Sequence, residues 1–244
     1  MRREILALCM FSALAGPALA GCGGPKAEPK TEPSAPTASA PPAKPRGPKM
    51  GVSQELGEID PKLAEAALKQ AQPDLARCHK AGLKRVEFMA GDVKLFVRVG
   101  EDGKVRYAYF EDSTLGDRAT EKCMLDAVAR APWPKPSGGD AEVRKPFGFD
   151  AGDAREPTAW SPDKVKDALA KHDAELKSCK AGVTGSFKAT LYVEPDGKEG
   201  KVAAAGVAPP NKDGEAKVDC LVDALKGMKL PSPGSYAAKV TFSL

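Results

Sequence analysis

The chain has 244 residues, which is enough for one large domain or two small ones. Hydrophobic residues make up 42% and charged residues 29%, the balance of a folded globular protein. A formal net charge of +4 and an aromatic content of 6% are both too low to indicate a nucleic-acid-binding protein. The 22 prolines and 6 cysteines are unevenly placed along the chain, and their positions guide the predictions that follow.

Residues 1–21 are predicted to be a lipoprotein signal peptide. A basic start at residues 1–3 precedes a stretch from 5 to 20 that is almost wholly apolar or small, the layout of an export signal. This stretch is too short and too poor in large side chains for a stable transmembrane helix. It ends in Leu-Ala-Gly-Cys at residues 19–22, which resembles the lipobox of bacterial lipoproteins. The alternative is an ordinary signal peptide that is cut after Ala20.

The resemblance to a lipobox implies that the thiol of Cys22 is acylated and that the chain is cleaved just before it. Several acyl chains together give stable anchoring in a lipid bilayer. Gly23 stands where an aspartate retains some lipoproteins in the inner membrane. The outer membrane, facing the periplasm, is therefore the expected location.

Residues 22–50 are predicted to be a lipidated cysteine followed by a disordered tether. Eight prolines lie between residues 23 and 50, mixed with Ala, Ser, Thr and Lys, and no apolar period is visible there. This composition favours an extended, solvated chain that holds the folded part away from the membrane.

The rest of the chain reads as two copies of one module, over residues 51–150 and 161–244, joined by a linker at 151–160. Each copy opens on a helix signal, a capping residue followed by proline, at Asp60-Pro61 and at Ser161-Pro162. Apolar residues then recur at helical spacings of three and four. They are Ala64, Leu68, Ala71, Leu75 and Cys78 in the first copy, and Val165, Leu169, His172, Leu176 and Cys179 in the second. Pro73 should kink or split the first helix.

Alternating residues follow each helix and predict strands. Val93, Leu95, Val97 and Val99 form the inward set of the first copy, and Phe187, Ala189, Leu191 and Val193 form that of the second. Hairpin turns at 102–103 and 196–197 lead to second strands near 104–111 and 201–207. A second helix then carries Cys123 or Cys220, prolines end it, and a last strand lies near 142–149 or 237–243. The predicted fold is α+β, with the order helix, strand, strand, helix, strand in each copy.

The four cysteines beyond the signal and the lipobox predict two disulfides. Export places them in an oxidising compartment, and four cysteines allow three pairings. The repeat selects one of these, because each copy holds one cysteine near the end of its first helix and one in its second helix. The predicted bonds are Cys78–Cys123 and Cys179–Cys220, each joining helix to helix. Redox exchange is the alternative, but no Cys-x-x-Cys motif is present and each cysteine lies in an apolar stripe.

The first copy resembles the AgmX/PglI C-terminal domain family of myxobacterial envelope proteins, which is TonB-like. An ordered set of segments over about 75 residues carries the resemblance: 75–79 (LARCH), 91–95 (GDVKL), 102–105 (DGKV), 112–117 (DSTLGD), Cys123, 133–136 (WPKP) and 144–149 (RKPFGF). The second copy keeps both cysteines, the Asp-Gly turn and the closing prolines, but lacks the tryptophan and the Ser-Thr-Leu-Gly turn, so it resembles a diverged duplicate. The resemblance implies two tandem TonB-like modules, each with a three-stranded antiparallel sheet, in gliding or other envelope machinery.

No catalytic or cofactor motif accompanies these modules. The sequence lacks glycine-rich nucleotide loops, His-Glu-x-x-His and Gly-x-Ser-x-Gly. Its two histidines, His79 and His172, do not cluster with further metal ligands, so no metal and no cofactor are expected. A hydrolase remains as a third hypothesis, yet no nucleophile with a nearby base can be identified. The chain is therefore predicted not to be an enzyme, with no small-molecule substrate and no nucleic-acid partner.

The expected function is a lipid-anchored protein-binding or scaffold module of an envelope complex, such as one of motility or transport. An open sheet edge in a TonB-like module can pair with an extended segment of an envelope protein. Lys94, Phe96 and Arg98 share the face away from the predicted core and are the candidate contact residues. The alternatives for this face are packing against the second copy and plain solvation. The alternative for the whole chain is a passive structural protein associated with peptidoglycan or lipid.

Overall fold

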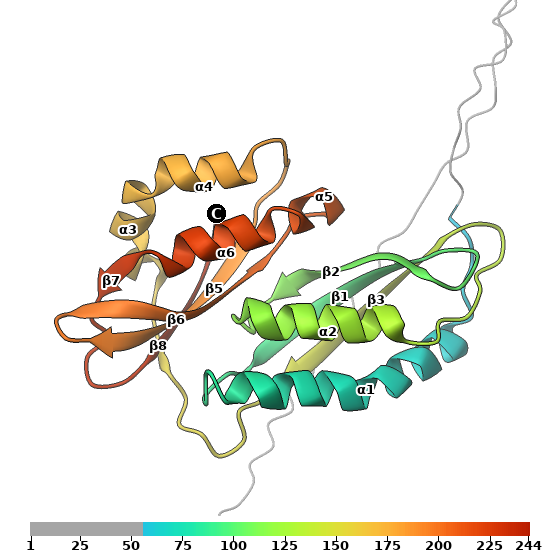
Figure 1. Cartoon of the computed structure of the whole chain (residues 1–244), viewed down its shortest axis with the longest axis horizontal. Helices are drawn as coiled ribbons and strands as arrows, with labels where there is room; N and C mark the ends of the chain where they lie inside the picture. The colour runs from blue at the N-terminus through green and yellow to red at the C-terminus, as the bar shows by residue number, and fades with distance from the viewer. Residues whose placement is uncertain (1–55) are drawn as a thin grey trace, which may run out of the picture. The chain divides into compact units, whose positions relative to one another are not determined.

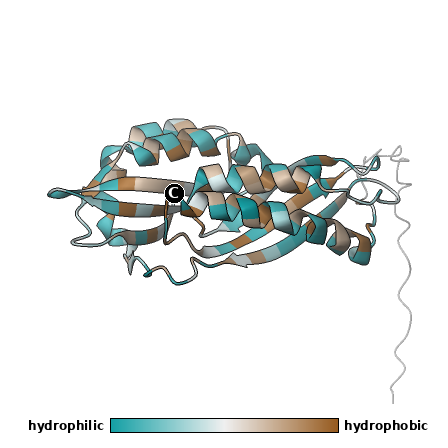
Figure 2. Cartoon of the chain, turned by 60° about the horizontal axis from the view of Figure 1, so that its bottom comes forward, coloured by the Kyte–Doolittle hydropathy of each residue, from teal (hydrophilic) through white to brown (hydrophobic). Residues whose placement is uncertain are grey.

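The computed structural model describes residues 56–244, which form two sheets with their helices (Figure 1). The predictions for the signal peptide, for Cys22 and for the tether lie outside the described residues. The α+β class is confirmed, since helices stand between the antiparallel strands of each sheet along the chain. Hydrophobic and hydrophilic residues alternate along the strands, as Figure 2 shows, and this is the pattern of strands with one face in a core.

The first module has the predicted order of elements. These are α1 (Pro61–Leu83), β1 (Gly91–Val99), β2 (Val105–Ser113), α2 (Arg118–Arg130) and β3 (Ala141–Phe149). The sheet has the order β2-β1-β3, and both pairings are antiparallel. Helices α1 and α2 lie side by side on one face of it (Figure 1). The inward residues of β1 are buried beneath them, with Leu95, Val97 and Val99 fully inaccessible.

Helix α1 begins as predicted but does not split. The carboxylate of Asp60 accepts hydrogen bonds from the backbone N–H groups of Lys62 (2.8 Å) and Leu63 (3.2 Å), and Pro61 is the first helical residue. Of the two outcomes predicted for Pro73, a kink or a split, the split does not occur, because one helix continues through it to Leu83. A proline removes one hydrogen bond from the helical ladder. Packing of the apolar stripe against the sheet keeps the helix continuous across that gap.

The second module departs from the prediction in its sheet. Its elements are β4 (Thr158–Ala159), η1 (Pro162–Lys164), α3 (Lys166–Lys171), α4 (Asp173–Lys180), β5 (Lys188–Asp196), β6 (Glu199–Ala208), α5 (Lys212–Glu215), α6 (Val218–Lys226), β7 (Lys229–Pro231) and β8 (Ala238–Ser243). The predicted three-stranded sheet is wrong here, since five strands pair in the order β4-β8-β5-β6-β7. The two additional strands lie at the edges. Strand β4 belongs to the segment predicted as a linker and pairs with β8 in parallel.

The first helical region of the second module is interrupted, whereas its counterpart α1 is not. Helices α3 and α4 meet at His172, whose backbone has left the helical range (φ −103°, ψ 11°). The proline that was expected to break a helix is therefore in the copy that stays continuous.

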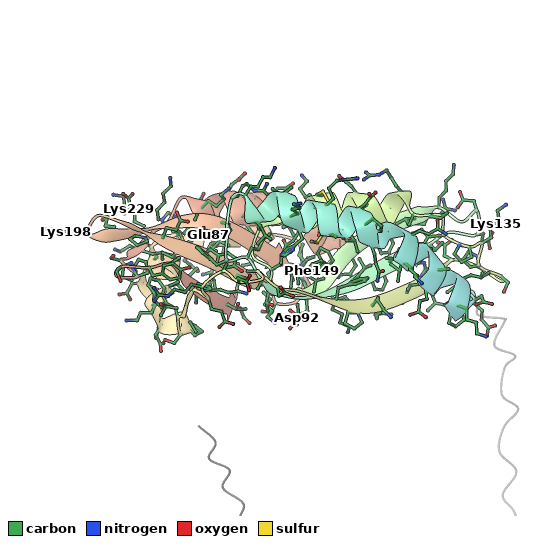
Figure 3. All side chains as sticks on the ribbon, turned by 90° about the horizontal axis from the view of Figure 1, so that it is seen from below. Glu87, Asp92, Lys135, Phe149, Lys198 and Lys229 are labelled. Carbon is green, nitrogen blue, oxygen red and sulfur yellow. A yellow bond between two sulfur atoms is a disulfide. The ribbon has the colours of Figure 1, made fainter. Side chains whose placement is uncertain are left out.

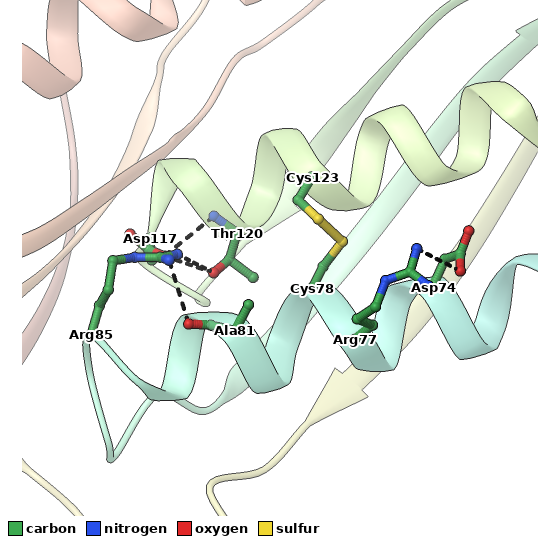
Figure 4. The surroundings of a disulfide bond; sticks show 8 residues. All are labelled: Asp74, Arg77, Cys78, Ala81, Arg85, Asp117, Thr120 and Cys123. Carbon is green, nitrogen blue, oxygen red and sulfur yellow. Dashed lines mark hydrogen bonds and ion pairs between the residues drawn. A yellow bond between two sulfur atoms is a disulfide. The ribbon is translucent and has the colours of Figure 1, made fainter.

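Both disulfides have the predicted pairing. Cys78 is bonded to Cys123 and Cys179 to Cys220, with Cα–Cα distances of 5.7 Å and 5.6 Å. The first bond joins α1 to α2, as Figure 4 shows. Because the bonds close loops of 45 and 41 residues, the chain-entropy argument gives each a stabilisation of about 4 kcal/mol. Disulfides of this kind are typical of proteins in an oxidising compartment.

The outer face of the second sheet packs against the first module. The hydroxyl of Tyr192 on β5 donates to the carbonyl oxygen of Ala90 (3.0 Å) and accepts from the N–H of the same residue (3.2 Å). Tyr192 and Ala204 are buried within the core of the first module. Charged pairs surround this contact, including Lys188 with Asp112 at 2.7 Å. The two modules therefore form one unit, which covers residues 51–244.

Candidate partner-binding edge

The three predicted contact residues share one face of the first sheet, opposite the helices, but they differ in accessibility. Lys94 is exposed, whereas Phe96 has 3% and Arg98 9% of its surface accessible. The ring of Phe96 stacks on Tyr109 (centroids 5.0 Å apart), and the guanidinium of Arg144 lies 4.5 Å from its centroid. Of the three, Lys94 is the one whose side chain a partner can reach.

Ion pairs connect the same face across all three strands. Arg98 pairs with Glu142 (3.0 Å) and Glu111 pairs with both Lys94 (3.0 Å) and Arg144 (2.8 Å). Burial acts to raise the pKa of Glu111, but the hydrogen bonds from Arg144 and Lys94 outweigh it and hold that pKa below its ordinary value. The carboxylate therefore stays charged at neutral pH, and this face is internally neutralised.

Strand β3 offers a different surface, because its outer edge is open. It pairs with β1 on one side, and within residues 56–244 no strand pairs with the other side of 141–149. Pro146 of β3 lies opposite Lys94 of β1. Because proline has no N–H to donate, these two residues form one of the antiparallel pairs that exchange no backbone hydrogen bonds. The backbone N–H and C=O groups of such a residue point away from β1, and residues two positions apart along a strand point the same way. The backbone groups of Glu142, Arg144 and Gly148 therefore point away from β1, to the open side of the edge.

The first outward position of this edge is already used by the chain itself. The carbonyl oxygen of Asp140, which belongs to the same alternating set, accepts a hydrogen bond from the N–H of Gly57 (3.0 Å). Glu58 and Ser137 form an isolated antiparallel bridge beside it. A short piece of chain thus shows how an added strand would begin.

A groove runs between this edge and α1. It consists of two cavities of about 440 Å³ and 310 Å³ that share Gln72 and Phe147. Leu68 and Leu75 of α1 contribute apolar surface, and Phe149 lies beside α1 in Figure 3, with its ring 5.1 Å from that of His79. Phe147 and Phe149 therefore give the groove apolar surface beside the unpaired backbone groups.

Lysines give one end of the groove a positive charge. Lys62, Lys69 and Lys145 line it together with a single carboxylate, Glu65, which pairs with Lys145 at 3.4 Å. The edge strands of the second sheet, β4 and β7, have only two and three residues, so each presents fewer backbone groups than β3 does. Short edge strands are a common way to prevent pairing with another chain.

Sequence reasoning expected an open edge from the resemblance to TonB-like modules, but it did not say which strand forms that edge and it placed the candidate contact residues on the face of the sheet. The signal that could have located the edge is Pro146, because a proline inside a strand is confined to edge strands and bulges.

In the described part of the chain, no group of three or more His, Cys, Asp or Glu residues converges in a way that could hold a metal ion. The Nε2 of His79 lies 3.0 Å from the carbonyl oxygen of Met89, and the Nδ1 of His172 lies 3.1 Å from Glu175. Across residues 56–244, the helices are all too short or too polar to cross a bilayer. Comparisons with protein-family models, curated proteins and solved structures gave no match.

Proposed function

We propose that this chain is a non-catalytic, lipid-anchored lipoprotein of the cell envelope, and that its first module binds an extended segment of another envelope protein along β3. The observation that carries the proposal is the open edge of β3 beside a groove that Phe147 and Phe149 line. The export-type N-terminus and the two disulfides support an envelope location. The antiparallel three-stranded sheet with two helices on one face supports the TonB-like assignment of the first module.

Binding would proceed by strand addition. The outward N–H and C=O groups of Glu142, Arg144 and Gly148 would form the ladder with the partner, and Pro146 would contribute its carbonyl oxygen. Alternate side chains of the partner would point into the groove, towards Phe147. The second module would serve as a support, since its outer face is covered by the first module and its edge strands are short.

Crosslinking of the intact lipoprotein in its native envelope, followed by mass spectrometry, tests this function. The informative variant is Arg144→Pro, which removes an outward N–H at a position that does not bond to β1. Arg144→Ala is its matched control, because it removes the same ion pairs with Glu111 and Glu142 but keeps the N–H.

We expect specific capture of one or a few envelope proteins by the unmodified chain and by Arg144→Ala, and loss of that capture in Arg144→Pro. Equal capture by both variants would remove the strand-addition mechanism. Capture of cell wall and abundant neighbours only would favour a passive structural protein associated with peptidoglycan or lipid.

A further inference from the structure

Another cavity lies where the two modules meet, just beyond the C-terminal end of β3. Its volume is about 470 Å³, which is within the range of small-molecule sites. Three stretches of chain form its wall: the start of β1 with the residues before it, the segment 150–159, and β8. The cavity therefore exists only when the modules are packed together.

The second half of the segment 150–159 is held against the second module. The hydroxyl of Tyr236 donates to the carbonyl oxygen of Arg155 (2.8 Å), and the guanidinium of Arg155 lies 4.2 Å from the ring centroid of Tyr236. The N–H of Thr158 donates to the carbonyl oxygen of Ala237 (2.9 Å), where β4 joins β8. The wall is a fixed part of the fold.

Lys239 supplies the positive charge of this cavity. Its neighbours on β8, Ala238 and Val240, point into the core, so the lysine side chain points to the opposite face of the sheet. The ammonium donates to the carbonyl oxygen of Ala90 (2.6 Å) and lies 5.3 Å from the ring centroid of Tyr192. Among residues 56–244, no carboxylate lies within 4.0 Å of this nitrogen, although every lysine ammonium carries three N–H donors.

The remaining wall is mostly apolar. Phe88, Ala90, Ala154, Pro157 and Ala159 line it, and Thr241 adds a hydroxyl near the lysine. Two carboxylates are also present, but Asp150 and Glu156 are both exposed, and Asp150 already accepts the N–H of Gly152 (2.9 Å). Exposed charges are screened by water and salt far more than a half-buried ammonium is.

Burial costs a cation free energy unless an anion compensates it. Here burial lowers the pKa of Lys239, and the distant Asp92 opposes that effect only in part. The ammonium of Lys239, which faces the cavity, therefore has a positive charge and N–H donors that a carboxylate would compensate and accept from.

We propose that this cavity binds a small organic acid, with its carboxylate on the ammonium of Lys239 and its apolar body against Phe88 and the alanines of the 150–159 segment. The site adjoins the groove beside β3 only through Asp150, and no sequence pattern indicates it. It would make ligand binding and the packing of the two modules mutually dependent.

Benzoate is a suitable probe, and benzyl alcohol is the neutral control with the same ring. Titration of the full chain, followed by ligand-observed NMR and calorimetry, should give saturable binding of benzoate and at least tenfold weaker binding of benzyl alcohol, since a hydrogen bond to a charged group contributes about that factor. Lys239→Met should weaken the binding of benzoate by a similar factor. Lys198→Met, which changes an exposed lysine labelled in Figure 3, should leave it unchanged.

A second variant keeps the test decisive if Lys239→Met fails to fold. Ala154→Leu reduces the cavity without altering the lysine and should also abolish benzoate binding. Equal binding of benzoate to Lys239→Met and to the unmodified chain would overturn the proposal. Binding of benzoate to the unmodified chain that is no tighter than that of benzyl alcohol would also overturn it. So would the absence of saturable benzoate binding to the unmodified chain.

Discussion

The hydroxyl of Ser113 donates a hydrogen bond of 2.5 Å to the carboxylate of Glu121, at the point where the second module covers the first. Glu121 has 1% of its surface accessible. The backbone of Gly206 on β6 lies against it, so a Cβ atom at that position would be 2.7 Å from a carboxylate oxygen. The second module thus completes the burial of an acidic side chain that belongs to α2.

This burial makes the stability of the chain depend on pH. Burial raises the pKa of Glu121 to about 7, although the Ser113 hydroxyl and Arg118 act to lower it. The other charged groups that face it, Asp117 on α2 and Glu215 on α5, also raise its pKa. Because the folded state holds this proton more tightly than the unfolded state does, the contribution of Glu121 to stability is fully present at acid pH and is lost as the pH rises through about 7.

Glu121→Gln should therefore be more stable than the unmodified chain at pH 8, by an amount on the order of 3 kcal/mol, and nearly equal to it at pH 5. Glutamine has almost the same shape, keeps an acceptor for Ser113 and carries no charge. Urea unfolding of both proteins at the two pH values measures the difference. A difference that stays constant between pH 5 and pH 8 would show that Glu121 does not titrate in this range.

Gly206→Ala should loosen the contact between the modules. The new methyl group would meet the Glu121 carboxylate and the Cα of Gly116 at 2.9 Å, and neither neighbour is a flexible side-chain end in open space. Overpacking of this kind costs about 1–3 kcal/mol in urea unfolding. Gly227→Ala is the control, because its nearest contact would be 3.5 Å away and its backbone is in the right-handed helical region. Equal effects of the two substitutions would contradict the close packing at Gly206.

Replacing both members of a disulfide by alanine should lower the free energy of unfolding by roughly 2–5 kcal/mol in either module. The loops closed by the two bonds are of similar length, 45 and 41 residues, so the entropic losses should be similar. Thermal unfolding of the two double variants, compared with the oxidised chain, checks this. A negligible loss of stability on removing one of the disulfides would mean that the unfolded chain is already compact in that module without the bond.

Asp60→Ala should cost about 1 kcal/mol, because the carboxylate caps two N–H groups at the start of α1. Ser161→Ala is a matched control at the equivalent position of the second module, where the side chain makes no capping hydrogen bond. Chemical denaturation should show a loss for the first and almost none for the second. Equal losses of unfolding free energy in the two variants would show that the capping hydrogen bonds of Asp60 do not stabilise the fold.

The repeat could be predicted from the sequence because its signals are local. Alternation in β1 and β5, the Asp-Gly turns and the paired cysteines all occur within a few residues or recur in both copies. Strands β4 and β7 escaped prediction because two or three residues cannot show an alternating pattern. The contact between the modules was equally hidden, since Thr190 and Tyr192 read as the solvent face of a strand, yet both are completely buried.

The candidate edge was only partly predictable for the same reason. A sequence indicates that a strand contains a proline, as β3 does at Pro146, but the order of strands in a sheet depends on contacts between distant segments. The cavity around Lys239 is formed by three segments that are distant in the sequence, so no single stretch of sequence predicts it.

The bond between Gly57 and Asp140 has a mechanical consequence. Tension that arrives from the N-terminal side of the chain meets the fold first at Gly57 and Glu58, which are hydrogen-bonded to Asp140 and Ser137 just before β3. A partner strand on β3 would pull on the other part of the same edge. The load would then pass from anchor to partner along one strand, and the disulfide-linked helices would lie outside its path.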